Sequence, residues 1–354
     1  MSDRRKEAEE KMAKAIFISA DCWLCVFDLL PPRQLGFGIA MISHRFDFYV
    51  DEHFKTRKWI MKYIRIRSKI GENGTKQMEI VNSPHSKSMQ IPQNSLPKKI
   101  VGFEVISIRY IDRNTIAFLR RFCPLFAACN INLDIYAGND RISEFILRNI
   151  WPMLGKNIHA IEMSVRFFHR LRKFVPSILN DCPPLRVVSF LDDIFTEFPA
   201  DDSAAASDGQ SVAKWLFTPR PDNVPKMFKC WLYWDDGNLA SKIAALKAAF
   251  ASASSPVNFI ISVWFASSSA ASVVPFDQTN EFTREQLALK RINSNRFLLI
   301  RCPIVRDASK WTKWEKEAIG WEICVQRNQI GIKMYREEDI GDGLLDTTPG
   351  PSDQ

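Results

Sequence analysis

Cysteine and histidine are the residues through which this chain could bind a metal or carry out redox chemistry. Cys22 and Cys25 form a Cys-x-x-Cys pair, a spacing used by zinc sites and by dithiol redox centres. A structural zinc site of this kind draws its remaining ligands from a second pair, and none follows at zinc spacing. The two cysteines are therefore better interpreted as small packed side chains. None of the five histidines has a neighbouring glutamate at a helical metal-binding spacing, so we predict no metal site and no cofactor.

The sequence also lacks the motifs of common enzymes. It contains no Gly-x-Ser-x-Gly elbow for a nucleophilic serine. No glycine-rich loop follows a strand-like run, as phosphate binding in a nucleotide enzyme would require. The four residues 71–74 read as a turn by their composition. We therefore predict a protein that is not an enzyme and has no catalytic residues.

A basic segment, residues 55–76, is the main charge feature. It holds eight lysines and arginines and a single acid, Glu72. Its net charge of +7 therefore accounts for most of the net charge of +8 of the whole chain. A segment of this kind can bind nucleic-acid phosphates. In residues 63–70, however, apolar and basic residues alternate, which is typical of a half-buried strand whose basic side chains face water. The strand is the preferred interpretation, and nucleic-acid binding stays a less favoured alternative.

The composition is that of an ordinary globular protein, with 46% hydrophobic and 25% charged residues in a chain of 354. It excludes a wholly disordered chain, a coiled coil and a collagen-like protein. Residues 259–265, the best apolar run, fall far short of the roughly 18 residues of a membrane-spanning helix. Acids interrupt the basic start of the chain, unlike a signal peptide, and the eight cysteines are scattered. We expect a protein of the cytoplasm, the nucleus or both, without a membrane partner.

From residue 101 onward, short strand-like runs alternate with helix-like stretches. The first four runs centre on Ile108, Leu133, Met163 and Val187, so they are 24 to 30 residues apart. A strand plus a helix every 20 to 30 residues or so is typical of an α/β solenoid of the leucine-rich-repeat kind. The expected strands are 105–111, 131–136, 161–165, 185–191, 230–234, 257–265 and 296–301, and the expected helices are 115–126, 142–154 and 167–179.

A doubly wound parallel sheet is the alternative to the solenoid. Strands of a doubly wound sheet are buried on both faces and read as continuous apolar runs. Here Asn132 and Asp134 alternate with Ile131, Leu133 and Ile135, which favours strands with one buried and one open face. We expect residues 321–325 and 330–334 to close the domain as a terminal antiparallel pair.

Three short apolar segments lie near the start of the chain, at residues 21–30, 33–42 and 45–60, and the third overlaps the beginning of the basic segment. Three short helices within about 40 residues bury too little surface to be stable alone. They should therefore pack against a partner or against the following domain.

The first apolar segment ends in Leu30-Pro31, and a leucine, an Ile-Ser-x-Arg-Phe run and a late tryptophan follow it. The residues of this pattern are Leu30, Pro31, Leu35, Ile42, Ser43, Arg45, Phe46 and Trp59. With these residues the region resembles an F-box, whose family pattern has an apolar first helix that ends in Leu-Pro, a later leucine, a Val-Ser-x-Arg-Trp/Phe run and a late tryptophan. The Leu-Pro that usually opens the pattern is Ile18-Ser19 here. A divergent F-box followed by degenerate strand–helix repeats is similar to the F-box families expanded in nematodes.

The resemblance implies a substrate-recognition subunit of an SCF-type cullin ubiquitin ligase. The F-box would dock on the Skp adaptor, which binds the cullin scaffold, and the C-terminal domain would hold a protein target. Catalysis would belong to other subunits, and this chain would act through proximity. Two alternatives stay open, a solenoid interaction module that has lost adaptor binding and a nucleic-acid-binding protein that uses residues 55–76. The implied adaptor-binding residues are Trp23, Val26, Phe27, Leu30, Pro31, Leu35, Ile42, Phe46 and Trp59.

The predicted fold class is mixed α/β, a three-helix F-box followed by a leucine-rich-repeat-like α/β solenoid with a C-terminal antiparallel cap. The target should bind to the open strand face of the solenoid. The predicted segments are a flexible tail (1–14), the F-box (15–62), a strand and proline-containing connector (63–100), the repeat domain (101–336, with an insertion at 199–212) and a disordered acidic tail (337–354). Strand alternation predicts target-binding residues at Arg109, Asn132, Asp134, Tyr136, Glu162, Arg166, Phe190, Trp231 and Tyr233.

Overall fold

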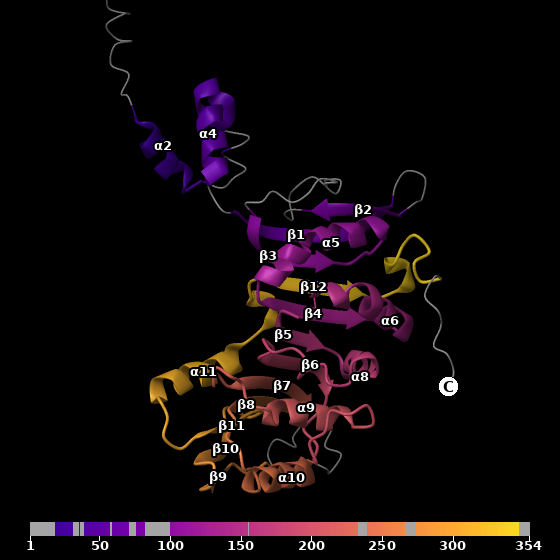
Figure 1. Ribbon diagram of the computed structural model, residues 1–354, viewed down its shortest axis with the longest axis vertical. Helices are drawn as coiled ribbons and strands as arrows, with labels where there is room; N and C mark the ends of the chain where they lie inside the picture. Colours follow the sequence, from indigo (N-terminus) through magenta and orange to yellow (C-terminus); the bar gives the residue numbers. More distant parts are fainter. Residues whose placement is uncertain are drawn as a thin grey trace, which may run out of the picture. The chain divides into compact units, whose positions relative to one another are not determined.

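A computed structural model describes residues 18–30, 35, 39–56, 59–70, 76–81, 100–154, 156–232, 239–265 and 273–346 of the chain. These residues fall into two units. The small unit comprises residues 1–59 and 97–101, and the large unit comprises residues 60–96 and 102–354. The mixed α/β class is confirmed, because the large unit combines a 12-stranded sheet with helices (Figure 1).

The small unit is built from α2 (Ala20–Phe27), the 3-10 helix η2 (Ala40–Ile42) and α4 (His44–Thr56). Its core contains Phe27, Leu35 and Val50, which are all at least 98% buried. The Trp23 and Phe46 rings pack edge to face beside this core, 4.8 Å apart. The first and third predicted helices are therefore present, whereas the described part of the second is a single 3-10 turn.

The sheet of the large unit is parallel in its middle and antiparallel at both ends. Parallel pairing runs from β3 through β12, β4, β5, β6 and β7 to β8, and β8, β11, β10 and β9 pair antiparallel. At the other end, β1 and β2 form an antiparallel pair. In spatial order the strands are β2 (Lys76–Val81), β1 (Trp59–Ile70), β3 (Ile100–Ile108), β12 (Gln329–Met334), β4 (Ile131–Ala137), β5 (Ile158–Met163), β6 (Val187–Asp193), β7 (Lys226–Leu232), β8 (Phe259–Phe265), β11 (Arg296–Pro303), β10 (Glu285–Arg291) and β9 (Phe276–Asn280).

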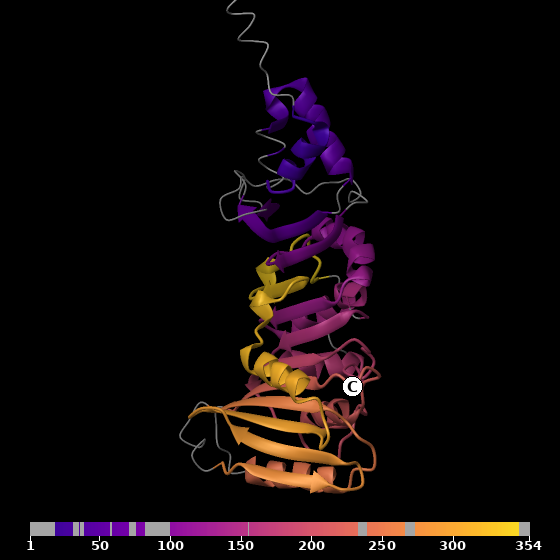
Figure 2. The same cartoon turned by 90° about the vertical axis from the view of Figure 1, so that its left-hand side faces the viewer.

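Helices cover the two faces of this sheet unequally. In Figure 2, α5 and α11 lie on opposite sides of the sheet. We call the side that packs against α11 (Ala308–Gly320) the α11 face, and the other side the helical face. A 3-10 turn, η4 (Ile323–Val325), follows α11. The helices of the helical face are α5 (Arg113–Ala128), α6 (Asp140–Asn149), α7 (Trp151–Leu154), α8 (Val165–Phe174), α9 (Asp208–Phe217) and α10 (Leu239–Ala251).

Local sequence explains where the helices of the helical face begin. The Asn139 side chain accepts from the Ile142 backbone N–H at 2.9 Å and caps α6. The Ser164 hydroxyl caps α8 in the same way. The Ser207 hydroxyl and the Gln210 side chain form a reciprocal capping box on α9. The helices α6 and α8 follow β4 and β5 within a few residues, which produces the strand–helix alternation that the spacing predicts, whereas a longer connection separates α9 from β6.

The predicted antiparallel cap is wrong. Residues 323–325 form the 3-10 turn η4, and β12 lies inside the sheet, parallel to both β3 and β4. Ile330, Ile332 and Met334 of β12 are fully buried. Alternating apolar residues specify a strand but not its partners, so the sequence pattern is equally compatible with the middle of the sheet. The leucine-rich-repeat-like assignment of the domain stays a prediction.

Two predicted segment boundaries also differ from the structure. Within the predicted insertion 199–212, α9 begins at Asp208. The predicted acidic tail includes residues 337–346, which fold back onto the large unit as the 3-10 turn η5 (Glu337–Asp339) and a following loop. Ile340 and Leu345, apolar residues of an otherwise acidic segment, are 93% and 92% buried there. Residues 347–354 lie outside the described residues.

Candidate functional site

A row of polar side chains crosses the α11 face of the parallel sheet. The register places Asp134 of β4 beside Glu162 of β5, Glu162 beside Ser189 of β6, and Ser189 beside Lys229 of β7. Ser262 of β8 continues the row. In-register residues of neighbouring strands project from the same face, so these five side chains form one line, which we call the polar row.

Charges in the polar row are compensated by direct contacts. Lys333 of β12 pairs with Asp134, with 2.7 Å between its Nζ and the carboxylate Oδ2. The Ser189 hydroxyl donates to Glu162 Oε2 at 3.0 Å. Lys229 donates through Nζ to the backbone carbonyl of Trp321, and its ammonium lies 5.3 Å from the centre of the Trp321 ring. The row therefore also fixes the segment between α11 and η4 against the sheet.

Burial changes the acid–base properties of the polar row. It raises the pKa of Glu162, opposed by the Ser189 hydrogen bond and supported by the neighbouring Asp134 carboxylate. Burial lowers the pKa of Lys229, although Glu162 opposes this effect. Burial also acts to lower the pKa of Lys333, but its hydrogen bond and ion pair with Asp134 outweigh it and raise that pKa. Such groups can form hydrogen bonds and ion pairs with a binding partner.

Aromatic side chains lie beside the polar row near the carboxyl ends of the strands. The Trp231 and Trp264 rings stack with their centres 5.0 Å apart, and the Arg296 guanidinium lies 5.3 Å from the Trp264 ring. The Tyr136 and Tyr335 rings are 4.9 Å apart. The two tyrosines are 37% and 55% exposed, so this edge combines polar groups with accessible aromatic surface.

The α11 face is not open over its whole width. Ala160, Val187, Met227 and Ile260 form an apolar row that is buried together with the Trp311 side chain of α11. Figure 2 shows α11 lying across this side of the sheet. The predicted open strand face is therefore partly covered. Alternation within a strand indicates which of its faces is less apolar, but it does not show whether a helix distant in sequence packs on that face.

Several predicted target-binding residues do share the α11 face. Asn132, Asp134, Tyr136, Glu162 and Trp231 lie on it in register. Asn132 and Asp134 are 92% and 95% buried, however, because Asn132 donates to the Arg327 carbonyl at 2.6 Å and Asp134 holds Lys333. Only the half-buried and exposed members of this group can reach a partner.

Three other predicted target-binding residues lie elsewhere. Phe190 is fully buried on the helical face, where its ring packs 5.1 Å from Phe168 of α8. The predicted phase of β6 is therefore wrong by one residue, and its polar member is Ser189. Arg166 belongs to α8 and pairs with Asp140, because β5 ends before it. Arg109 is exposed just after β3, and Tyr233 lies outside the described residues.

The small unit separates the predicted adaptor-binding residues into buried and exposed groups. Phe27 and Leu35 are fully buried in its core and offer no exposed surface in this structure. Val26 and Ile42 are 43% and 63% exposed. The other described members are half-buried, namely Trp23, Leu30 and Phe46. Pro31 and the Trp59 side chain lie outside the described residues.

The structure also exposes apolar residues that the sequence reasoning missed. Leu29 is 84% exposed in the turn after α2, and Phe48 is 59% exposed on α4. Ile18 is 38% exposed just before α2. The helical phase of α4 carries the signal for Phe48, since its core-facing residues Phe46, Val50 and His53 recur at helical spacing and Phe48 lies between them.

The basic segment forms the strand that its alternation predicts. Ile64 and Ile66 are at least 95% buried in β1, whereas Arg67 is exposed and Arg65 is half-buried. Arg65 donates through Nε to the Tyr63 hydroxyl at 2.8 Å. The confirmed strand accounts for the alternation without phosphate binding, and nucleic-acid binding stays a prediction.

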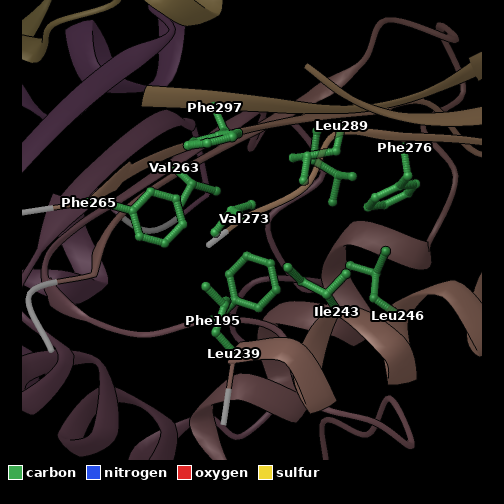
Figure 3. Close-up of a pocket in the computed structure, with 11 residues that line it drawn as sticks. Phe195, Leu239, Ile243, Leu246, Val263, Phe265, Val273, Phe276, Leu289 and Phe297 are labelled. Atoms are coloured by element: carbon green, nitrogen blue, oxygen red, sulfur yellow. The ribbon is translucent and has the colours of Figure 1, made fainter. Parts of the chain in front are cut away.

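An apolar void lies between α10 and the helical face of the strands β8, β11, β10 and β9 (Figure 3). Eleven apolar side chains line it, including Phe195, Ile243, Val263 and Phe297. Its cavity volume is about 10 Å³, which is at the lower limit for a single water molecule. The void is therefore a packing defect rather than a ligand site.

Comparison with known proteins found no match to this chain. Neither a protein-family model, nor a curated protein, nor a solved structure matches the chain. In the described part of the chain, no helix combines the length and apolar character needed to cross a membrane. The same residues contain no group of three or more histidine, cysteine or acidic side chains placed to hold a metal ion.

Proposed function

We propose that this protein is the substrate-recognition subunit of an SCF-type cullin ubiquitin ligase. The small unit would dock on the Skp adaptor, which binds the cullin scaffold, and the large unit would hold a protein target. The observation that carries the proposal is that the F-box-like sequence coincides with a separate helical unit that leaves Val26, Leu29 and Ile42 exposed. Large apolar side chains that a small unit cannot bury are typical of an interaction surface.

The large unit supports the second half of the proposal. Glu162 and Lys333 of the α11 face are half-buried charged groups, and Lys333 is in register with the accessible Tyr136, whose ring lies 4.9 Å from that of Tyr335. Aromatic residues with polar neighbours often dominate protein recognition. The chain would perform no chemistry itself and would accelerate ubiquitin transfer by holding a target lysine near the ubiquitin-carrying enzyme.

The decisive experiment is calorimetric titration of the full chain with purified Skp adaptor. The perturbing variant is Leu29→Asp with Ile42→Asp, because both side chains are more than 60% exposed and outside the core of the small unit. The matched control is Phe282→Asp with Val305→Asp, which places the same charge on exposed apolar residues of the large unit, 79% and 93% exposed. Circular dichroism verifies that all three proteins are folded.

We expect micromolar or tighter adaptor binding by the parent chain and the control, and at least a tenfold loss in the Leu29/Ile42 variant. Two buried apolar anchors of an interface typically contribute more than about 1.4 kcal/mol, which is a factor of ten. Absence of binding by the folded parent chain would contradict the proposal. It would instead favour an interaction module without adaptor binding, the interpretation suggested by Ile18-Ser19 at the usual Leu-Pro position.

A further inference from the structure

The C-terminal strand joins two parts of the sheet in the large unit. In the described sheet, β12 is the strand through which the group β2–β1–β3 is hydrogen-bonded to the group that begins with β4. It pairs in parallel with β3 on one side and with β4 on the other. Figure 1 shows β12, coloured yellow, between the purple strands β3 and β4. The last strand of the described residues therefore completes a sheet whose neighbouring strands come from the first half of the chain.

The residues after β12 hold it in place. The Asp342 carboxylate accepts from the Arg113 backbone N–H at 2.9 Å, at the first turn of α5. Glu337 accepts from Asn139 Nδ2 at 3.0 Å and from Arg141 Nη1 at 2.7 Å, at the first turn of α6. Acidic groups are favourable at helix N-termini, because unpaired backbone N–H groups and the helix dipole make these ends positive. We call residues 335–346 the C-terminal clasp.

Backbone bonds tie the C-terminal clasp to the end of β3. The Ile111 N–H donates to the Asp339 carbonyl at 2.9 Å, and the Gly341 N–H donates to the Ile111 carbonyl at 2.8 Å. On the β4 side, the Gly138 N–H donates to the Met334 carbonyl at 2.8 Å. The clasp and β12 thus contact β3, α5, β4 and α6 together.

We propose that β12 and the C-terminal clasp form a releasable keystone of the large unit. When they detach, the strands β1 to β3 lose their connection to the sheet and open as one group, while β5 to β8 keep their own pairing. Removal or capture of residues 329–346 would then uncouple the strands that directly follow the small unit in sequence from the polar row. The proposal stands independently of the ubiquitin-ligase function.

Gly138 offers a local way to loosen the keystone. A Cβ atom at this position would lie 2.8 Å from the Tyr335 carbonyl carbon and closer still to its oxygen, so Gly138→Ala must push the end of β12 away from β4. Gly331, inside β12 itself, has no heavy atom within 4 Å of such a Cβ. Gly331→Ala is therefore a matched control, with the same chemical change placed in β12 rather than at the end of β4.

Amide hydrogen exchange of the full chain, followed by mass spectrometry, tests the keystone. In Gly138→Ala we expect at least tenfold faster exchange in β12 and in β1 to β3, with β5 to β8 within twofold of the parent chain. In Gly331→Ala we expect all strands within twofold. Unchanged exchange in β1 to β3 of Gly138→Ala, or equal acceleration in β5 to β8, would overturn the proposal.

Asp342→Ala provides a second variant in case Gly138→Ala does not fold. It removes the acceptor for the Arg113 N–H without adding any atom, so the sheet itself is not strained. We expect about threefold to tenfold faster exchange in the same strands, β12 and β1 to β3, because the hydrogen bond between the clasp and the start of α5 is lost. No preferential acceleration of these strands would again contradict the keystone.

Discussion

The buried ion pair between Arg301 and Glu285 offers the sharpest test of the packing of the large unit. Arg301 is fully buried and Glu285 is 99% buried. Arg301 Nη2 lies 2.6 Å from Glu285 Oε2, and its Nε is 3.2 Å from each carboxylate oxygen. The guanidinium lies between the Phe217 and Phe250 rings, 5.0 and 5.2 Å from their centres. Either charge would be left without its counter-charge in an apolar environment if the other were removed.

Glu285→Gln is the central perturbation. The glutamine can still accept from the Val257 backbone N–H, which Glu285 binds at 2.8 Å, but its amide nitrogen then replaces the Oε2 acceptor of Arg301 Nη2, so the variant removes the charge and this hydrogen bond together. Breaking a buried pair by removing one partner costs about 3–5 kcal/mol. At a urea m-value of about 3 kcal/mol/M, the unfolding midpoint should fall by about 1–2 M. Arg301→Met should cost a similar amount, since it leaves the carboxylate buried alone.

The double variant Glu285→Gln with Arg301→Met decides whether the cost is electrostatic. Methionine fits beside phenylalanine rings, and the remaining loss is the donor to the Ser255 carbonyl, worth about 1–3 kcal/mol. Urea unfolding followed by circular dichroism should therefore place the double variant above either single variant in stability. Two results would refute this reasoning: single variants that each cost less than about 1 kcal/mol, or a double variant whose loss equals the sum of the two.

Three further predictions concern the same unit. Ser207→Ala removes the capping box on α9 and should lower the free energy of unfolding by about 1 kcal/mol in thermal denaturation, and an unchanged midpoint would contradict that role for the cap. Trp311→Ala should cost about 3–5 kcal/mol, because this 95% buried side chain packs α11 onto the sheet, and a loss below 1 kcal/mol in urea would show that α11 is not held there. Burial lowers the pKa of Lys226 to about 7, so above pH 7 the unfolded chain binds more protons than the folded one and stability rises with pH. Between pH 7 and 9 this contributes about 2–3 kcal/mol, and Lys226→Met should remove that part of the pH dependence, whereas an identical slope in the variant would rule out Lys226 as its source.

Local sequence signals predicted much of the strand–helix alternation. The expected helix 115–126 lies within α5, and the expected strand 131–136 lies within β4. The caps Asn139 and Ser164 are also local, since each side chain bonds a backbone N–H three residues ahead. The strands β9 and β10 and the helices α10 and α11 were not predicted, and the register of the strands remained open.

The candidate site was predictable only in part. Alternation placed Asp134 and Glu162 on one face correctly, because side chains of a strand alternate whatever its partners are. The same rule failed in β6. Its run is apolar except for Ser189, so the sequence pattern did not show which of Val188, Ser189 and Phe190 face the helices. In the small unit, helical spacing identified the apolar residues but did not separate the core residues Phe27 and Leu35 from the exposed Ile42.

The sequence by itself determined many of the elements of this protein, because caps, apolar periodicity and turn residues act over a few neighbouring positions. Only the tertiary structure decided that β12 enters the sheet between β3 and β4, that α11 covers part of one face, and that Arg301 meets Glu285. The first two pairings join segments far apart in the chain, and the third joins the neighbouring strands β10 and β11. Each satisfies a hydrogen-bonding edge, an apolar surface or a charge that other segments could also have satisfied. Their choice depends on the packing of the whole unit, which no local pattern encodes.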